Sequence, residues 1–330
     1  MKTKLLTTVA VLAAWTTIAP SANAALIAWD ATFFNDVALN PADYASFQSS
    51  INTTLNYYTT NWEVPNAITV KIEFHATNTG LGAAATFRQE VQYQDYRNAL
   101  AATGTSLNDM TAIAFLPNSA ANPVNSHGQL NTTLPLLRAL GFPEGDRSLI
   151  GAPWDASLGL NVTLMQLDRS GPVNPALYDL QQVTYHELNE VLGFTSRLNG
   201  VPNTPGPGPS GPIQPADLFR YENSGVRSWN TDPAALQPYF SINNGVTKLA
   251  EFDVDDVADR QDFNGTFNGS PFFSVQDAFS TPGLRLDNAL AERTFLDVIG
   301  YNAVPEPGSA VLLVMGTLTL ITRRRKARSA

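Results

Sequence analysis

The stretch Val183-Thr-Tyr-His-Glu-Leu-Asn-Glu-Val-Leu-Gly-Phe194 decides how the rest of the chain is interpreted. In an α-helix each residue advances about 100°, so His186 and Glu190 lie one turn apart on the same face. Glu187 lies on the flank of that face, and most of the surrounding leucine and valine side chains point the opposite way. We therefore expect this helix to bury one side in a core while His186 and Glu190 face a cleft.

The predicted helix extends over residues 175–192. Asn174 is a favourable N-cap, and Pro175 suits the first helical position. Gly193 suits the left-handed cap that follows the last turn. These signals predict a long helix that ends within the quoted stretch.

The spacing of His186, Glu187 and Glu190 is that of the zinc-hydrolase motif His-Glu-x-x-His, with glutamate in place of the second histidine. Glu187 and Glu190 lie on neighbouring turns, and no Lys or Arg occurs between Arg169 and Arg197 to compensate them. Like charges at this spacing repel each other, and a bound cation would offset the repulsion. Spacing alone leaves two interpretations open, a metal site and an ordinary solvated helix face.

The composition restricts which side chains can carry chemistry. The 330-residue chain contains no cysteine, which excludes disulfides, thiolate nucleophiles and cysteine metal ligands. Any metal site must therefore use His, Asp or Glu. Of the other histidines, His75 is expected on the solvated side of a strand and His127 in an exposed polar loop. No Gly-x-Ser-x-Gly motif is present, so a serine hydrolase is the weakest alternative.

Both ends of the sequence have the composition of processing signals. Residues 1–24 combine a basic start, an apolar run and an Ala-Asn-Ala site, as in a secretory signal peptide. Residues 304–330 combine Pro-Glu-Pro, an apolar run over 310–321 and a terminal basic cluster. That run is short for an unaided membrane span, which needs about 20 residues. Residues 25–303 are the expected folded domain, and their net charge near −15 argues against nucleic acid as a partner.

The order of the expected elements indicates an α+β domain. Strands are expected at 25–34, 66–75, 110–116 and 158–167, and helices after Pro41 and over 133–140 and 288–299. Residues 79–87 are expected to form a Gly/Ala loop, and the Pro/Gly-rich segment 200–212 an exposed loop or hinge. The strand at 158–167 precedes the quoted helix and is expected to line the cleft, where an extended substrate can pair with it.

A second acidic region lies downstream, at residues 251–262, and contains six Asp and Glu side chains. Their spacing does not fit an EF-hand loop, which needs a glycine at its sixth position. A solvated acidic surface is the default interpretation, and a calcium site of another type is the alternative.

The helix His186-Glu187-Leu-Asn-Glu190-Val-Leu-Gly193 is similar to that of a family of secreted, PEP-CTERM-bearing bacterial proteins classed as zinc-dependent metalloproteases. In that family a His-Glu-x-x-Glu helix stands where metzincins have His-Glu-x-x-His-x-x-Gly-x-x-His. The resemblance covers most of residues 30–301 and implies a zincin-like fold with a mixed sheet and a central metal-binding helix. Other segments that resemble the family are 217–221, 225–228, 239–242 and 296–301.

The resemblance implies a role for each residue of the site. His186 and Glu190 would be metal ligands, and Glu187 would be the general base that deprotonates water. The third metzincin ligand position is Ser196 here, and serine is a poor zinc ligand. Asp217 opens the first ordered segment after the Pro/Gly-rich loop and is the expected third ligand.

Further expectations concern a second catalytic residue, which the resemblance implies, and the metal. Tyr221 is the expected residue that polarises a substrate carbonyl. Zn²⁺ is the expected cofactor, and the acidic segment 251–262 makes Ca²⁺ a second possible ion. Two anionic ligands neutralise more of the metal's charge than imidazoles do, so we expect slow hydrolysis at neutral pH or a preference for a harder metal.

The C-terminal segment, with its Pro-Glu-Pro, apolar run and basic cluster, resembles the PEP-CTERM sorting signal. This resemblance implies a Gram-negative bacterium and an exosortase that processes the tail. It also implies export through the inner membrane to the outer surface or the extracellular matrix. The run 310–321 would then serve as a transient membrane anchor.

Two functions are compatible with these features. The first is a secreted or surface-held metallopeptidase that hydrolyses protein or peptide substrates. The second is a surface or matrix protein on the same scaffold that binds metal or polysaccharide and catalyses nothing. The sorting signals fit both functions, so only the site distinguishes them.

Overall fold

The computed structural model describes residues 25–201, 207–229, 232, 234, 236–255 and 257–304. The expected signal peptide, the sorting tail from residue 305 onward and part of the Pro/Gly-rich loop lie outside these residues. No helix in the described ranges is long and apolar enough to cross a membrane. That finding does not extend to the apolar run in the tail.

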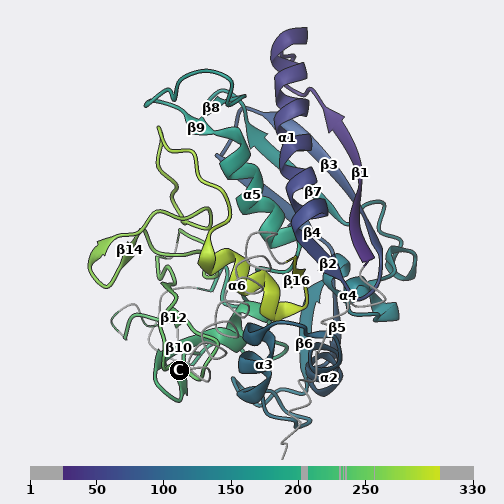
Figure 1. Cartoon of the computed structure of the whole chain (residues 1–330), viewed down its shortest axis with the longest axis vertical. Helices are drawn as coiled ribbons and strands as arrows, with labels where there is room; N and C mark the ends of the chain where they lie inside the picture. The colour runs from purple at the N-terminus through teal and green to yellow at the C-terminus, as the bar shows by residue number, and fades with distance from the viewer. Residues whose placement is uncertain are drawn as a thin grey trace, which may run out of the picture.

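A six-stranded mixed sheet forms one layer of the molecule, in the order β16-β2-β1-β3-β7-β4 (Figure 1). The strands β1 (Ala25–Phe34), β3 (Ile68–Thr77) and β7 (Ala156–Asn161) are parallel. At one edge, β4 (Gly82–Thr86) is antiparallel to β7. Toward the other edge, β2 (Trp62–Val64) is antiparallel to β1, and β16 (Asn302–Ala303) is antiparallel to β2. The predicted α+β class is confirmed, as a curled mixed sheet with helices packed on it.

The strand β3 shows how the sheet divides into a core face and an outer face. Every second side chain of β3 is buried, as the pleat of a strand requires. The outer face carries His75, whose Nδ1 lies 2.7 Å from Asp36 Oδ2 and whose side chain is 27% exposed. His75 therefore lies on the polar side of its strand, as predicted.

Two helices lie side by side on the core face of the sheet (Figure 1). The helix α1 (Pro41–Asn61) begins where predicted, because Pro41 fills the first position and the Asn40 side chain accepts hydrogen bonds from the next two N–H groups. The helix α5 (Leu180–Val191) packs beside α1. The buried apolar side chains of α1 are Phe47, Ile51, Leu55 and Tyr58.

Shorter elements complete the fold. The other α-helices are α2 (Tyr93–Thr103), α3 (Leu107–Ala114), α4 (Leu134–Ala139) and α6 (Leu290–Ile299). The paired short strands are β5 (Arg88–Gln92) with β6 (Gln129–Thr133), β8 (Met165–Gln166) with β9 (Tyr178–Asp179), and β14 (Thr266–Phe267) with β15 (Ser270–Pro271). A four-stranded sheet contains β10 (Arg220–Asn223), β11 (Val226–Arg227), β12 (Tyr239–Phe240) and β13 (Ala250–Glu251). Turns of 3-10 helix cover Pro143–Gly145, Arg147–Ile150 and Pro215–Phe219.

Some predictions of secondary structure are wrong. Residues 110–116, expected as a strand, fall mostly in α3, because Ser106 and Asp109 form a capping box that starts a helix there. Residues 79–87, expected as a loop, contain β4, because pairing with β7 overrides the weak strand preference of alanine. The strand expected at 158–167 is divided between β7 and β8.

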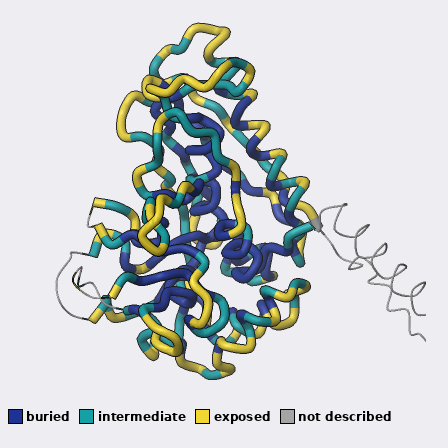
Figure 2. Tube along the Cα trace, turned by 60° about the vertical axis from the view of Figure 1, so that its left-hand side comes forward, coloured by how far each residue is buried: buried dark blue, intermediate teal, exposed yellow. Residues whose placement is uncertain are grey.

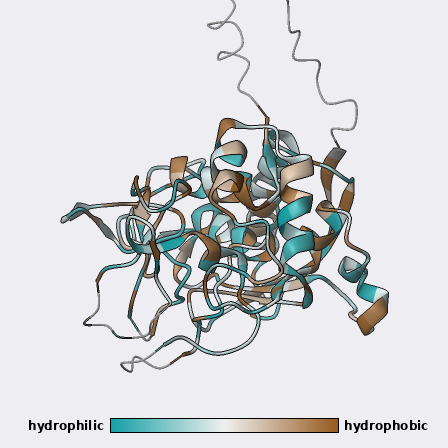
Figure 3. Cartoon of the chain, turned by 90° about the horizontal axis from the view of Figure 1, so that it is seen from below, coloured by the Kyte–Doolittle hydropathy of each residue, from teal (hydrophilic) through white to brown (hydrophobic). Residues whose placement is uncertain are grey.

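The hydrophobic core joins the sheet to the later part of the chain. Figure 2 shows the buried trace in dark blue inside the molecule and exposed loops in yellow on its outside. The helices carry both brown and teal segments in Figure 3, as expected for helices with one buried side. Phe194, just after α5, is in edge contact with Phe263 and Phe295, with ring centroids 5.5 Å and 3.8 Å apart. This contact fixes the segment around Phe263 against the end of α5.

Candidate metal centre

The helix α5 supplies the first residues of the centre and is shorter than predicted. It begins at Leu180, because Asp179 is the N-cap and its carboxylate accepts a hydrogen bond from the N–H of Gln182. Asn174, the predicted cap, instead accepts a hydrogen bond from the N–H two residues on and closes a local turn. The predicted start at residue 175 is therefore wrong.

His186, Glu187 and Glu190 line one cleft of about 320 Å³. Every residue of α5 is buried except His186, whose side chain is 16% exposed. Residues from two later segments, 257–259 with 262 and 275 with 277, 278 and 280, line the same cleft, so these segments cover the polar side of α5. The interpretation of this side as an ordinary solvated helix face is therefore wrong.

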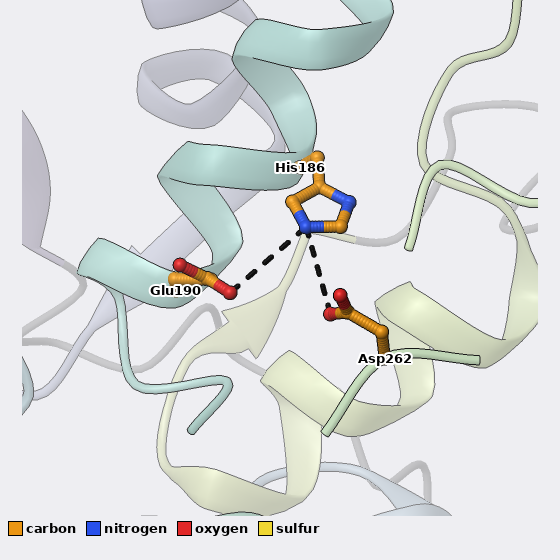
Figure 4. Close-up of side chains that lie close together, drawn as sticks. All are labelled: His186, Glu190 and Asp262. Atoms are coloured by element: carbon orange, nitrogen blue, oxygen red, sulfur yellow. Dashed lines mark ion pairs between the residues drawn. The ribbon is translucent and has the colours of Figure 1, made fainter. Parts of the chain in front are cut away.

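Asp262 joins His186 and Glu190 in a group whose possible ligand atoms all lie within 4.8 Å of one another (Figure 4). His186 Nε2 lies 3.5 Å from Asp262 Oδ1 and 3.9 Å from Glu190 Oε1. Ligand atoms about 2.1 Å from a tetrahedral zinc ion are roughly 3.4 Å apart, so these separations are close to those of a zinc site. Across the described ranges, no second group of three such residues is found.

A backbone carbonyl orients the imidazole of His186. Its Nδ1 lies 3.1 Å from the carbonyl oxygen of Val275. A carbonyl oxygen can only accept, so Nδ1 donates the proton and the lone pair remains on Nε2, which faces Asp262 and Glu190. Histidines that bind metals commonly have an outer hydrogen bond of this kind.

Two glutamine side chains hold the carboxylates of the group. Gln261 Nε2 donates to Glu190 Oε1 over 2.5 Å. Gln276 Nε2 donates to Asp262 Oδ1 over 2.9 Å. These are the same two oxygens that lie nearest His186 Nε2, so neutral amides fix the direction of both carboxylates toward the imidazole without adding a charge.

A buried network extends this support to three other parts of the chain. Asn189, on α5, donates to Gln276 Oε1 over 3.1 Å and to Asn288 Oδ1 over 2.9 Å. The Tyr58 hydroxyl of α1 donates to Asn189 Oδ1 over 2.7 Å and accepts from Asn288. Fully bonded polar networks of this kind rigidify their surroundings, so the position of Asp262 depends on α1, α5 and the segment before α6.

Glu187 stands apart from the grouped ligands. It is buried, and within the described part of the chain no donor forms a hydrogen bond with its carboxylate. Its side chain packs against the edge strand β4, where a Cβ on Gly82 would lie 2.3 Å from Glu187 Oε1 and 2.7 Å from Val183 Cγ1. Glycine at position 82 is thus what leaves room for Glu187.

Burial and mutual repulsion raise the proton affinity of these carboxylates. Burial raises the pKa of Glu190 to about 8, and the charge of Asp262 adds to the rise. Burial also raises the pKa of Glu187 well above its usual range, with Glu190 as the second cause. The pKa of Asp262 is likewise raised, mainly by burial. A divalent cation would favour the charged forms of all three groups.

Asp217, the expected third ligand, does not belong to this group. The third member of the group is Asp262 instead. The Asp217 carboxylate accepts hydrogen bonds from the Ser196 hydroxyl over 2.6 Å and from the N–H groups of Arg197 and Gln214. These bonds make Asp217 a buried structural residue that joins the chain after α5 to the following helical turn.

Tyr221 also lies outside the lining of the cleft. It is 1% exposed, stacks with Tyr239 and lies beneath the guanidinium of Arg227, 4.6 Å from its ring centroid. Burial raises the pKa of its hydroxyl. Tyr221 therefore packs between other side chains, and its position does not support the role on a substrate carbonyl that was expected for it. His127 does not line the cleft either. Its Nδ1 accepts a hydrogen bond from the N–H of Gln129.

The acidic segment 251–262 is not the solvated surface that its composition predicts. Its exposed acids include Asp255 and Asp259. Phe252 and Phe263 lie near the two ends of the acidic segment, and their packing against each other draws their neighbours into the core. Phe263, directly after Asp262, is the one feature of the sequence that favours burial there, but it does not indicate which part of the chain Asp262 approaches. The acids of the segment found buried are Glu251, Asp253 and Asp262.

No protein-family model, curated protein or solved structure matches this chain. The interpretation of the centre therefore depends on its own side chains. One imidazole and two carboxylates form a donor set suited to zinc and related divalent metals. Burial, and then mutual repulsion, raise the pKa values of these neighbouring carboxylates, and a divalent cation among them would offset both effects.

Raising the pH is expected to destabilise the metal-free protein between the ordinary pKa of Glu190, 4.5, and its folded-state pKa of about 8. In this window the folded protein holds a proton that the unfolded chain has released. Unfolding therefore releases a proton, and the free energy of unfolding falls by up to about 1.4 kcal/mol per pH unit. Denaturant titrations of chelator-treated protein across this window measure the slope.

The variant Glu190→Gln lacks this titrating group and should show a shallower slope. Added zinc should have the opposite pH dependence, because metals bind the deprotonated carboxylates and their stabilising effect grows as the pH rises. A metal-free protein whose stability rises through the window would contradict the assigned protonation states.

Proposed function

We propose that this protein is a metal-dependent peptidase with a zincin-like fold, in which His186, Glu190 and Asp262 bind the metal. The observation that carries the proposal is the group of three ligand atoms within 4.8 Å of one another, in a cleft that also contains Glu187. The packing of α5 against a mixed sheet is consistent with the fold that the sequence resemblance implies.

The metal site and Glu187 would have different roles in hydrolysis. A divalent cation at this centre supplies Lewis acidity, which acidifies water and polarises a carbonyl oxygen. Glu187 is beside the ligands without being one of them, so its carboxylate is free to accept a proton from the attacking water and to pass it to the leaving amine. Burial, which raises the pKa of Glu187, suits a group that must both accept and donate a proton.

The donor set favours zinc over calcium. Calcium prefers six to eight oxygen ligands, whereas His186 offers a nitrogen. Two carboxylates reduce the positive charge that the ion presents to water more than imidazoles would. We therefore expect hydrolysis to be slower at neutral pH than at a three-histidine zinc site, and to accelerate as the pH rises.

The edge strand β4 offers a place for an extended peptide. Residues 81–84 line the cleft, and β4 is the last strand of its sheet. The unpaired backbone groups of an edge strand can pair with another extended chain. The strand β7, which contains the start of the segment expected in this role, is already paired with β3 and β4 on its two sides. The substrate strand is therefore reassigned to β4.

We further propose that the protein acts outside the inner membrane of a Gram-negative bacterium. Residues 1–24 would direct export, and an exosortase-type enzyme would process the tail. The apolar run 310–321 would anchor the chain transiently during this step. The acidic composition of residues 25–303 is compatible with a soluble extracellular protein, and it argues against a nucleic acid as partner.

Metal analysis and proteolysis of an unfolded protein such as casein test this function. We expect one metal ion per chain, cleavage that a chelator abolishes and zinc restores, and a rate that increases above neutral pH. A protein that binds no metal would refute the proposal. Stoichiometric metal without cleavage would instead support the second candidate, a surface protein that binds metal or polysaccharide without catalysis.

A further inference from the structure

The cleft carries more negative charge than a metal ion would neutralise. Its acidic lining residues are Glu187, Glu190, Asp259, Asp262 and Asp277. Among the described residues that line it, none is Lys or Arg. A divalent ion would balance Glu190 and Asp262, and Glu187 has its role in proton transfer. The Arg88 guanidinium, which does not line the cleft, interacts electrostatically with Glu190 and Asp259 and offsets one of the five negative charges. The cleft stays acidic even with Arg88 and a divalent ion, and neither Asp259 nor Asp277 has a role in the proposed hydrolysis.

These two aspartates lie on the chain segments that cover the polar side of α5. Asp259 is exposed and accepts a long hydrogen bond, 3.3 Å, from Gln261 Nε2. Asp277 is fixed by the N–H of Phe279 over 3.1 Å. Their charges also act on a residue of the centre. Burial is the main cause of the raised pKa of Asp262, and the negative charges of Asp259 and Asp277 raise it further.

The rest of the lining is mostly small and aliphatic. It includes alanines from β4 and from both covering segments. Lys and Arg side chains place an aliphatic stem along such walls while the charged end reaches a carboxylate. A Glu or Asp side chain would instead meet like charges as it lost its water. The small lining residues are Gly82, Ala83, Ala84, Ala258, Ala278 and Ser280.

We propose that Asp259 and Asp277 make the cleft selective for peptides with a Lys or Arg side chain beside the cleaved bond. This selectivity rests on the proposed peptidase function and adds the chemical class of its substrate. The two carboxylates attract the ammonium or guanidinium group, and the metal ligands take no part in that contact.

Matched fluorogenic peptides that carry Lys, Ala or Glu beside the cleaved bond test the selectivity on the zinc-loaded protein. We expect kcat/KM to be on the order of 100-fold higher for the Lys peptide than for the Glu peptide, because the two substrates differ in the sign of a charge set against two carboxylates. The preference should shrink at high salt, because salt screens partly exposed charges.

The double variant Asp259→Asn/Asp277→Asn should lower the Lys-to-Glu ratio at least about tenfold. The matched control, Asp30→Asn/Asp95→Asn, removes two exposed acids that are not part of the lining and should keep the wild-type ratio. A loss of folded protein would lower the rates on all peptides in proportion, so the ratio and its salt dependence report on charge alone.

The possible outcomes separate this selectivity from the peptidase function. Equal cleavage of the Lys and Glu peptides would overturn the selectivity and leave the peptidase function intact. If no peptide is cleaved, the peptidase function fails, and fluorescence anisotropy with the labelled peptides decides the charge preference. Equal affinity for the two peptides would then overturn it, and tighter binding of the Lys peptide that disappears in the double variant would support it.

Discussion

Replacing Glu187 by glutamine is expected to lower peptide hydrolysis by roughly 10²–10⁴-fold while bound metal stays in place. The amide keeps the shape of the carboxylate but cannot accept a proton from water. Glu187 lies outside the group of three ligands, so the variant retains the complete ligand set. Measuring kcat/KM together with metal content distinguishes a lost base from a lost metal.

The matched control for this variant is Glu90→Gln, which changes an exposed residue of β5 in the same way. Its rate and metal content should equal those of the wild type. Without metal, the Glu187→Gln protein should also resist denaturant better than the wild type, because it lacks a buried carboxylate whose pKa burial raises. Hydrolysis at the wild-type rate by Glu187→Gln would remove Glu187 from the mechanism.

Replacing Asp262 by asparagine is expected to weaken zinc binding by at least about 100-fold. Loss of an outer hydrogen-bond partner costs 10–100-fold in affinity at metal sites, and loss of a ligand should cost no less. Asparagine keeps the volume and can still accept from Gln276, so the network survives. A competition titration against a chromogenic zinc chelator measures the change.

The variant Asp217→Asn separates the ligand indicated by the structure from the one expected from sequence. It should keep the zinc affinity but lose about 1–3 kcal/mol of stability, because Asp217 accepts three hydrogen bonds in a buried position. The reverse pattern, with zinc binding lost in Asp217→Asn and kept in Asp262→Asn, would show that the centre has been assigned wrongly.

Elements with strong local signals could be predicted from the sequence. The strand β1 has its predicted bounds, and α1 starts at the predicted proline because Asn40 caps it. The start of α5 could not be predicted, since Asn174 and Asp179 are both good caps. Only the pairing of β8 with β9, which holds Tyr178 and Asp179 in extended form, makes the later residue the cap.

The candidate centre, too, could be predicted from the sequence only in part. His186 and Glu190 follow from helix periodicity, since both are on one helix. Asp262 lies in a segment without periodicity, and it reaches the centre through the packing of Phe263 on Phe194 and the hydrogen bond from Gln276. Such contacts between distant segments leave no spacing in the sequence, so composition pointed to a solvated surface instead.

The dependence of the centre on late parts of the chain has a consequence for biosynthesis. Under the proposed export, which starts from the N-terminus, His186 and Glu190 would emerge before Asp262, and Gln276 and Asn288 would follow later still. Until those residues have emerged and packed on α5, the centre lacks a ligand and its supports. If the proposed peptidase function holds, a protein assembled in this order would be inert while it threads through the secretion channel, and it would gain the ability to cut proteins only after it has left the export machinery.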